Sequence, residues 1–450
     1  MKQHISLNGK TILVTGSPGF IGSNLVIRLL TDTGLMTNGN IVSLDNMNDY
    51  YDPKLKEYRL SIIESVAEKS SVNHKFIRGS IADKALVDKI FVEYKPDIVV
   101  NLAAQAGVRY SIDHPDVYIE SNLIGFYNIL EACRHSYDEA CMSDAGGDSE
   151  AGDVYRGVQH LVYASSSSVY GGNKKVPFST DDKVDNPVSL YAATKKSNEL
   201  LAHSYSKLYN IPSTGLVAEG DDGAAYKGVQ HLVYASSSSV YGGNKKVPFS
   251  TDDKVDNPVS LYAATKKSNE LLAHSYSKLY NIPSTGLRFF TVYGPAGRPD
   301  MFYYSATEKL VRGETIKIFN YGNMKRDFTY VDDIVEGIIR VMQGAPLKST
   351  GDDGLPVPPY ALYNIGGGQP ENLLDYVSIL QEELVRARVL PEDYDFEGHR
   401  ELVGMQPGDV PVTYADSKGL EEDYGFVPKI GIREGLRKFA EWYKEYNKLG

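Results

Sequence analysis

An internal repeat constrains the fold of this 450-residue chain more than any other feature. The 60 residues from Gly157 to Leu216 recur, identical at every position, from Gly228 to Leu287. Each copy contains an apolar strand pattern, HLVYA, and an amphipathic helix pattern, SLYAATKKSNELLAHSYSKLY. Only one such strand and helix can occupy one position in a sheet, so we expect the other copy to be displaced. The identity indicates a recent duplication or an artefact of the sequence.

The residues around the two copies favour the second as the one in the sheet. The second copy continues directly into RFFTVYGPAGRPD, a further strand and loop, whereas the first ends in the Gly- and acid-rich VAEGDDGAAYK. The preference is modest, because loop entropy grows only logarithmically with length. The segment from Asp138 to Asp153 carries six acids and no bases and is predicted to be a solvated loop. The acidic loop and the surplus copy together span about residues 136–227.

The segment KTILVTGSPGFIGSNLVIRLL is typical of a dinucleotide-binding turn. An apolar run from Thr11 to Thr15 predicts a strand, and residues at helical spacing follow a glycine-rich turn. Glycines permit positive φ and close approach of a pyrophosphate, to which the helix N-terminus donates N–H groups. A second strand, NIVSLD, ends in an acid that can accept the ribose hydroxyls of NAD and repel a 2'-phosphate. The residues predicted to bind NAD are Gly16, Gly19, Phe20, Ile21, Gly22 and Asp45.

Strands and helices alternate beyond this turn. KPDIVVNLAAQAG reads as a strand and a loop, and SNLIGFYNILEACRH as an amphipathic helix. This alternation predicts an α/β fold, a doubly wound parallel sheet with helices on both faces, in which ligands bind at the carboxyl ends of the strands.

The repeated helix carries a Tyr-x-x-x-Lys pair suited to hydride chemistry. Tyrosine and lysine at i and i+4 share one helical face, and an ammonium favours the phenolate that accepts a proton from an alcohol. A serine run lies 25 residues upstream in each copy and supplies a hydroxyl for the same alcohol. The predicted catalytic residues are Tyr262, Lys266 and Ser237, with Tyr191, Lys195 and Ser166 as their repeat equivalents.

The composition excludes several classes of partner. The formal net charge is −11 without a basic block, which argues against nucleic acid and anionic membrane surfaces. Cys133 and Cys141 are too few for a disulfide framework or a Cys-based zinc site, and no metal site is expected. With no apolar run long enough to span a bilayer, we expect a soluble, cytoplasmic protein.

The chain resembles the extended short-chain dehydrogenase/reductase family, and within it the nucleotide-sugar 4-epimerases. The resemblance covers almost everything except the acidic loop and the extra copy. Its motifs occur in order: TGSPGFIG, NLAAQAGVRYS, SSSSVYG, YAATK, RFFTVYGPAGRPDM, KRDFTYVDDIVEG and QPGDVPVTYAD. DNMNDYYDPKLKEYRL and VYGPAGRPDM look most similar to the UDP-glucuronate 4-epimerases. One departure is Ser80, where many members have an aspartate that helps to hold adenine.

The resemblance implies further residue roles. It makes Tyr262 the base, Lys266 its partner and Ser237 the alcohol-binding hydroxyl. It places Ala103 and Ala104, together with Tyr262 and Lys266, at the cofactor. The implied substrate-binding residues are Ser237, Thr291, Arg298, Arg326 and Asn122, with Thr291 and Arg298 on a sugar carboxylate and Arg326 on the diphosphate. A guanidinium fork matches a carboxylate in shape and charge.

The resemblance also implies the reaction and the domains. It implies oxidation and re-reduction at C4 of a UDP-sugar, here UDP-glucuronate to UDP-galacturonate, without net consumption of NAD. UDP-galactose 4-epimerase and UDP-glucuronate decarboxylase are alternatives on the same scaffold, and an inactive NAD-binding or scaffolding protein is the alternative of another class. We expect a homodimer, a Rossmann domain over residues 1–298, and a smaller substrate-binding lobe over 299–450 from which a segment near 361–368 returns to the sheet.

Overall fold

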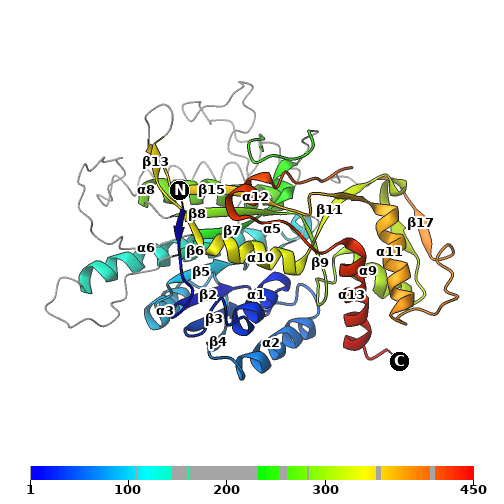
Figure 1. The fold of residues 1–450 in the computed structure, drawn as a ribbon, viewed down its shortest axis with the longest axis horizontal. Coiled ribbons are helices and arrows are strands. Elements are labelled where there is room, and N and C mark those ends of the chain that lie inside the picture. The colour runs from blue at the N-terminus through cyan, green and yellow to red at the C-terminus, as the bar shows by residue number, and fades with distance from the viewer. Residues whose placement is uncertain are drawn as a thin grey trace.

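A parallel sheet in two parts forms the centre of the molecule (Figure 1). The computed structural model describes residues 2–106, 110–143, 160–162, 232–242, 244, 246–253, 255, 261–280, 283–350, 356–405 and 411–449. The first part has the order β4-β3-β2-β5-β6 and the second β7-β8-β15, and every pairing within them is parallel. These strands are β2 (Thr11–Thr15), β3 (Asn40–Asp45), β4 (Asn73–Arg78), β5 (Ile98–Asn101), β6 (His160–Val162), β7 (Leu232–Ser237), β8 (Ser284–Phe289) and β15 (Tyr360–Ile365).

The strand order reverses between β2 and β5. The chain runs from β2 outward to β3 and β4, and then returns to β5 on the other side of β2. Right-handed crossovers therefore put the helices of the two halves on opposite faces of the sheet. In agreement with this, α1 packs against α2 and α10, while α3 packs against α6 and α8 contacts the turn before α6. The doubly wound α/β fold is confirmed, and its reversal point opens a crevice at the carboxyl ends of β2 and β5.

The helices have these bounds: α1 (Phe20–Thr31), α2 (Pro53–Ala67), α3 (Lys84–Tyr94), α4 (Tyr110–Asp113), α5 (Pro115–Tyr118), the π-helical turn η1 (Ile119–Ile124), α6 (Gly125–Ser143), the 3-10 turn η2 (Ser238–Tyr241), α8 (Leu261–Tyr280), α9 (Phe302–Val311), the 3-10 turn η3 (Phe319–Gly322), α10 (Val331–Met342), α11 (Leu373–Arg386), α12 (Lys418–Tyr424) and α13 (Ile432–Tyr446). Among the described residues, no helix is both long and apolar enough to cross a bilayer.

Strands from both copies of the repeat lie at the sheet, so the prediction that one copy is displaced from it is not confirmed. His160–Val162 of the first copy pairs with β5, and Leu232–Ser237 of the second pairs with β8. The two strands, β6 and β7, are also in contact with each other. The two strand segments have the same sequence, so each has the same backbone preference for a position in the sheet. The remainder of the first copy, residues 163–216, lies outside the described residues.

The helix before the acidic segment is longer than the sequence predicted. α6 continues to Ser143, so Asp138 to Ser143 is helical and the predicted solvated loop cannot begin before residue 144. Alanine, glutamate and methionine in this stretch favour helix, and this propensity outweighs the repulsion between its acids. Residues 144–159 lie outside the described part of the chain.

The C-terminal half forms a second layer beside the main sheet (Figure 1). Its strands are short: β9 (Thr291–Tyr293), β11 (Lys325–Tyr330) and β16 (Pro370–Asn372) form one sheet, and β10 (Ile316–Ile318) pairs with β17 (Arg400–Leu402). Two further antiparallel pairs join β1 (Lys2–His4) to β12 (Gly344–Pro346) and β13 (Ser349–Thr350) to β14 (Pro356–Val357). Beyond residue 298 the chain packs again on residues 1–298, with α10 on α1, β12 beside β1 and β15 beside β8. A division into domains at residue 298 stays a prediction.

Candidate active site

The turn between β2 and α1 lies at the reversal point and fits a diphosphate. Gly16 has φ +72°, and a Cβ there would lie 2.7 Å from the backbone nitrogen of Ala103. A Cβ on Gly22 would lie 2.3 Å from the carbonyl oxygen of Gly16, so neither position can hold a side chain in this backbone. Gly19 is the N-cap of α1 and supplies no capping side chain, which leaves the first N–H groups of the helix to a ligand. The predicted residues Gly16, Gly19, Phe20, Ile21 and Gly22 all line the cavity.

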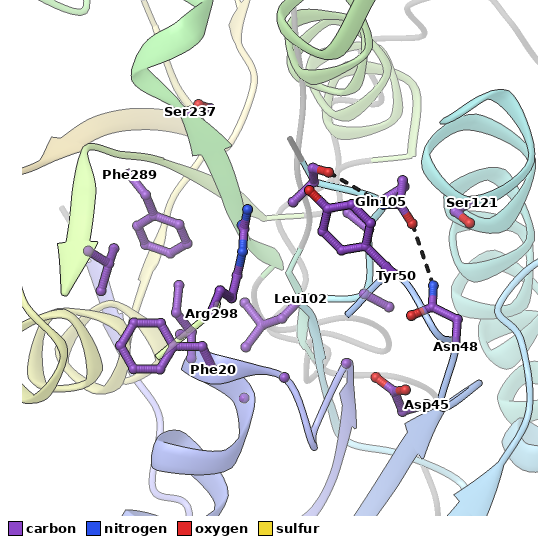
Figure 2. Close-up of a pocket in the computed structure, with 18 of the residues that line it drawn as sticks. Phe20, Asp45, Asn48, Tyr50, Leu102, Gln105, Ser121, Ser237, Phe289 and Arg298 are labelled. Atoms are coloured by element: carbon purple, nitrogen blue, oxygen red, sulfur yellow. Dashed lines mark hydrogen bonds between the residues drawn. The ribbon is translucent and has the colours of Figure 1, made fainter. Parts of the chain in front are cut away.

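Asp45, at the end of β3, lies in the same cavity (Figure 2). Its Oδ1 accepts the N–H of Met47 at 2.6 Å and lies 3.4 Å from the Nζ of Lys56. Lys56 also donates to the Oδ1 of Asn48 at 2.7 Å. A carboxylate at a strand end can accept ribose hydroxyls, as the sequence predicted. The nearby ammonium offsets part of its charge, so hydrogen-bond acceptance, more than repulsion of a phosphate, is what Asp45 offers to NAD.

The loop after β5 forms the opposite wall. Ala103 and Ala104 line the cavity, and the backbone N–H of Ala103 donates to Thr15 Oγ1 at 3.2 Å. This contact holds the loop against the end of β2 and brings Ala103 next to Gly16. Ser80, the departure from the family pattern, also lines the cavity, and its hydroxyl accepts the N–H of Ala82 at 3.1 Å.

Ser237, Tyr262 and Lys266 of the second copy meet at the cavity wall. Ser237 ends β7, and the other two residues lie one turn apart on α8. The Nζ of Lys266 lies 5.8 Å from the centroid of the Tyr262 ring. Tyr118 packs edge-on against Tyr262 at 6.4 Å between ring centroids. The repeat equivalents Tyr191, Lys195 and Ser166 lie outside the described residues.

The electrostatics of this cluster set its protonation. Burial raises the pKa of the Tyr262 hydroxyl, against which act a hydrogen bond with Ser237 and the charge of Arg298. Burial, assisted by the charge of Arg298, lowers the pKa of Lys266 to about 7. Tyr262 is therefore a phenol at neutral pH, and Lys266 is shared between charged and neutral forms. Ser237 and Arg298 act to lower the pKa of Tyr262, in addition to the effect that the sequence had assigned to Lys266.

Arg298 points into the cavity from the loop after β9 (Figure 2). Its Nε donates to Asp300 Oδ1 at 3.0 Å, and one terminal nitrogen, Nη2, donates to Asp300 Oδ2. Tyr50 donates to the same Oδ2 at 3.3 Å and fixes the carboxylate. Within the described part of the chain, Nη1 of Arg298 has no hydrogen-bond partner, so it is available to a ligand. Thr291, which begins β9, lines the same cavity.

Arg59 of α2 holds the loop that carries Arg298. Its side chain is 1% exposed and donates to the carbonyl oxygens of Ala296 at 2.9 and 2.6 Å and of Gly297 at 2.9 Å. It also donates to the Pro18 carbonyl oxygen in the glycine-rich turn at 3.1 Å. One guanidinium thus ties the loop of Arg298 to the turn predicted to hold the cofactor.

Two predicted substrate residues are placed differently. Asn122 is buried, accepts the N–H of Gln105 at 2.7 Å and donates to Thr265 Oγ1 at 3.2 Å, so it joins the β5 loop to α8 and does not line the cavity. Arg326 also stands outside the cavity lining, and one of its nitrogens donates to the Lys325 carbonyl oxygen at 3.1 Å. The resemblance assigned both to the substrate, and the structure does not bring them to the cavity with Tyr262.

Several cavity residues were missed by sequence reasoning. Asn48, Tyr50 and Lys56 line the cavity and belong to DNMNDYYDPKLKEYRL. Asp300, which holds Arg298, follows it two residues later in RPDM. Both segments were recognised as typical of a subgroup, but no role was assigned to these side chains. The resemblance of these two segments to the UDP-glucuronate 4-epimerases was the signal from which these side chains could have been predicted.

Two family models match the chain, one on each side of the repeat junction. Residues 13–218 match the GDP-mannose 4,6 dehydratase family, and residues 222–365 match the NAD dependent epimerase/dehydratase family. The first match therefore includes the first copy and the second match includes the second copy. Each copy lies in a segment that a nucleotide-sugar enzyme family recognises.

Known proteins resemble the chain along almost its full length. Protein CapI of Staphylococcus aureus is 38% identical, over 97% of this chain and 99% of that protein. UDP-glucuronate 4-epimerase 4 of Arabidopsis thaliana is 35% identical, over 98% of this chain and 76% of that protein. A probable UDP-glucuronate 4-epimerase of Rhizobium meliloti is 33% identical, over 96% of each.

Solved structures share the fold. The UDP-glucuronic acid 4-epimerase of Bacillus cereus, in complex with UDP-glucuronic acid and NAD, has a TM-score of 0.64 at 23% identity over 97% of this chain and 99% of that one. The UDP-glucose 4-epimerase of Thermotoga maritima has a TM-score of 0.62 at 22% identity, over 97% and 99%. With the full-length relatives and the glycine-rich turn, these findings show that the chain belongs to the NAD dependent epimerase/dehydratase family and is an NAD-dependent nucleotide-sugar epimerase.

Proposed function

We propose that this epimerase interconverts UDP-glucuronate and UDP-galacturonate at C4. The observation that carries the proposal is the presence of Arg298 in the same cavity as Tyr262. Nη1 of Arg298 can donate a hydrogen bond to a substrate carboxylate, while Nε and Nη2 remain bonded to Asp300. A neutral sugar would leave this cation facing a hydroxyl or water. UDP-glucuronate 4-epimerases among the relatives support the same substrate.

The side chains at the cavity wall supply proton transfer and orientation. Tyr262 accepts the proton of the C4 hydroxyl and later returns it, and Ser237 holds that hydroxyl by a hydrogen bond. Lys266 in its charged form stabilises the phenolate electrostatically. NAD held in this cavity would supply the hydride acceptor and donor for C4, so none would be consumed. The residues that would hold NAD are those of the glycine-rich turn, Asp45, Ala103 and Ala104.

Thr291 and Arg298 have a second role in the proposed reaction. Oxidation at C4 of a glucuronate gives a β-keto acid, which loses carbon dioxide when its carboxylate lies perpendicular to the keto plane. A carboxylate held by a hydroxyl and a guanidinium is kept from that orientation. Epimerisation without decarboxylation therefore depends on this pair. A homodimer and a cytoplasmic location remain predictions.

The test is incubation of the folded, NAD-loaded protein with UDP-glucuronate. We expect UDP-galacturonate and no carbon dioxide. Release of carbon dioxide would instead favour the decarboxylase, and turnover of UDP-glucose at the same rate would favour UDP-galactose 4-epimerase. Bound NAD without turnover of any of these sugars would support the inactive NAD-binding protein.

A further inference from the structure

A buried ion pair involves the residue that directly follows the second copy, where the sequences of the two copies first differ. Arg288 is the first residue after the second copy, and its side chain is 1% exposed; that of Glu270 is 2% exposed. Nε and Nη2 of Arg288 each donate to a different Glu270 oxygen at 2.8 Å. Burial would raise the pKa of Glu270, but the charges of Arg288 and, to a smaller extent, Lys267 outweigh it and lower this pKa to about 2. The pair is therefore ionised and strongly coupled.

Glu270 joins the elements that carry the catalytic residues. It lies on α8, one turn after Lys266 and two turns after Tyr262. Its Oε1 accepts the hydroxyl of Ser236 at 2.8 Å, the residue before Ser237 in β7. Arg288 belongs to β8. The position of α8 relative to both strands is therefore set at this one carboxylate.

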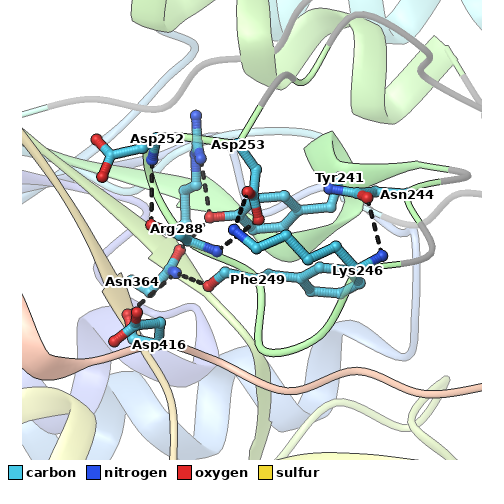
Figure 3. A network of polar contacts seen from close by, with 10 residues as sticks. Tyr241, Asn244, Lys246, Phe249, Asp252, Asp253, Arg288, Asn364 and Asp416 are labelled. Atoms are coloured by element: carbon cyan, nitrogen blue, oxygen red, sulfur yellow. Dashed lines mark hydrogen bonds and ion pairs between the residues drawn. The ribbon is translucent and has the colours of Figure 1, made fainter.

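Arg288 extends the network to a third strand (Figure 3). Its Nη1 donates to the Tyr241 hydroxyl at 2.9 Å, and Tyr241 donates to Asn364 Oδ1 in β15 at 2.7 Å. Asn364 donates in turn to the carbonyl oxygen of Phe249 at 2.7 Å. The guanidinium is thus held on several sides by the second copy and by β15.

The first copy lacks this arginine. Glu199 is its counterpart of Glu270, but Val217 stands where the second copy is followed by Arg288. Glu270 also pairs with Lys267 at 3.0 Å, and the first copy repeats that lysine. If the first copy supplied the helix and both strands, its glutamate would keep the lysine but face valine in place of the buried guanidinium. A buried charge that loses its partner is strongly destabilising. We propose that Arg288, acting through Glu270, is a positioning residue that commits the second copy, and not the first, to the active site.

The repeat supplies a matched pair of variants in the full-length protein. Glu270→Gln and Glu199→Gln make the same change within the same 60-residue sequence, so only the place of each copy in the fold differs. We expect kcat/KM to fall at least roughly tenfold in Glu270→Gln, because the buried guanidinium loses its counterion. Glu199→Gln should stay within about twofold of the parent, because under this proposal the helix of the first copy takes no part in the active site. A loss in Glu199→Gln as large as in Glu270→Gln, or no loss in either, would overturn the proposal.

The pH profile separates positioning from loss of folded protein. A shifted α8 moves Tyr262 away from Ser237, so we expect the acid limb of kcat in Glu270→Gln to move to higher pH. A fall in kcat that matches the loss of folded protein, with an unchanged pH profile, would reject a positioning role. Arg288→Lys keeps the charge without the fork and should retain more kcat/KM than Glu270→Gln; the reverse order contradicts the proposal. If Glu270→Gln does not fold, Arg288→Lys carries the pH comparison.

The activity readout rests on the proposed function, but NAD affinity does not. If the parent has no activity on UDP-glucuronate, the substrate proposal fails by itself. The same pair is then compared by NAD titration, in which we expect weaker binding in Glu270→Gln and parental binding in Glu199→Gln. Equal NAD affinities in these two variants and the parent would overturn the assignment of the second copy.

Discussion

At the residue scale, a few cationic side chains set the charge and the pKa values of the groups in the cavity. Arg298 acts on three groups: it pairs with Asp300, favours the phenolate of Tyr262 and lowers the pKa of Lys266. Lys56 lies against Asp45 at the cofactor end of the same cavity. The cations at the two ends have different predicted roles, because Lys56 is paired to Asp45, the predicted ribose acceptor, and Arg298 would face the sugar of the proposed substrate.

Arg298→Ala should lose activity on UDP-glucuronate while it keeps NAD. A charge-assisted hydrogen bond contributes about 1.5–3 kcal/mol, which corresponds to a roughly ten- to hundredfold fall in kcat/KM. Steady-state kinetics with UDP-glucuronate and NAD titration measure the two effects. Arg312→Ala, at an exposed arginine that forms a surface ion pair with Glu314, is the control and should behave as the parent. Parental kcat/KM in Arg298→Ala would contradict a role in carboxylate binding.

Lys266→Met should stabilise the ligand-free protein in a pH-dependent way. The folded-state pKa of Lys266 is about 7, below its value in the unfolded chain. Between pH 7 and about 10.4 the unfolded state therefore binds more protons, and this lysine makes the parent more stable as pH rises. The stabilisation by Lys266→Met should be greatest at and below pH 7 and shrink toward pH 10. Urea unfolding across this range measures it, and a difference independent of pH would show that the lysine titrates normally.

At the element scale, side chains from one element hold the loops of another. Arg59 of α2 binds the carbonyl oxygens of the loop between β9 and α9 and of the turn between β2 and α1. Glu270 of α8 is bonded to β7 and β8 in the same way. In both cases one buried charged side chain makes several hydrogen bonds at once. The elements that carry its partners are therefore held at fixed positions relative to one another.

Arg59→Lys should loosen the loop that carries Arg298. An ammonium cannot reach all the acceptors that the fork of Arg59 serves, and each buried carbonyl left unpaired costs about 1–3 kcal/mol. We expect a lower free energy of unfolding and higher KM values for both UDP-glucuronate and NAD. Urea unfolding and kinetics measure these effects, with Arg312→Lys as the exposed control. An unchanged KM for both ligands would show that the loop keeps its position without Arg59.

At the scale of the whole molecule, the repeat decides how the sheet is assembled. β6 from the first copy lies beside β5, whereas β7 from the second copy lies beside β8 and ends at the cavity. The sheet therefore takes strands from both copies, but Ser237, Tyr262 and Lys266 at the cavity all come from the second.

Tyr262→Phe should abolish epimerisation, and Tyr191→Phe should leave most of it. Each change removes one hydroxyl from an identical sequence context and keeps the ring, so packing is preserved in both. Conversion of UDP-glucuronate by the two variants, at equal NAD loading, is the measurement. An inactive Tyr191→Phe with an active Tyr262→Phe would place the active site in the first copy, and equal partial losses would mean that the copies exchange.

The sequence by itself predicted what depends on local pattern. The turn with Gly16, the strand ending in Asp45 and the pairing of Tyr262 with Lys266 on one helical face follow from spacing within a short segment. Backbone sterics and helical periodicity act over a few residues, so they can be read without the fold. The doubly wound sheet followed in the same way from the alternation of strands and helices.

Only the tertiary structure decided what depends on contacts between distant segments. Tyr50 and Asp300 are 250 positions apart, and no local pattern predicts that they share a hydrogen bond. The two copies have the same local preferences, so sequence reasoning did not foresee that a strand of the first copy pairs with β5. What distinguishes them is a neighbour outside the repeat: Arg288 reaches Glu270 only when β8 lies beside β7 and beneath α8. Burial makes this pair matter, because removing the guanidinium from a buried carboxylate is costly.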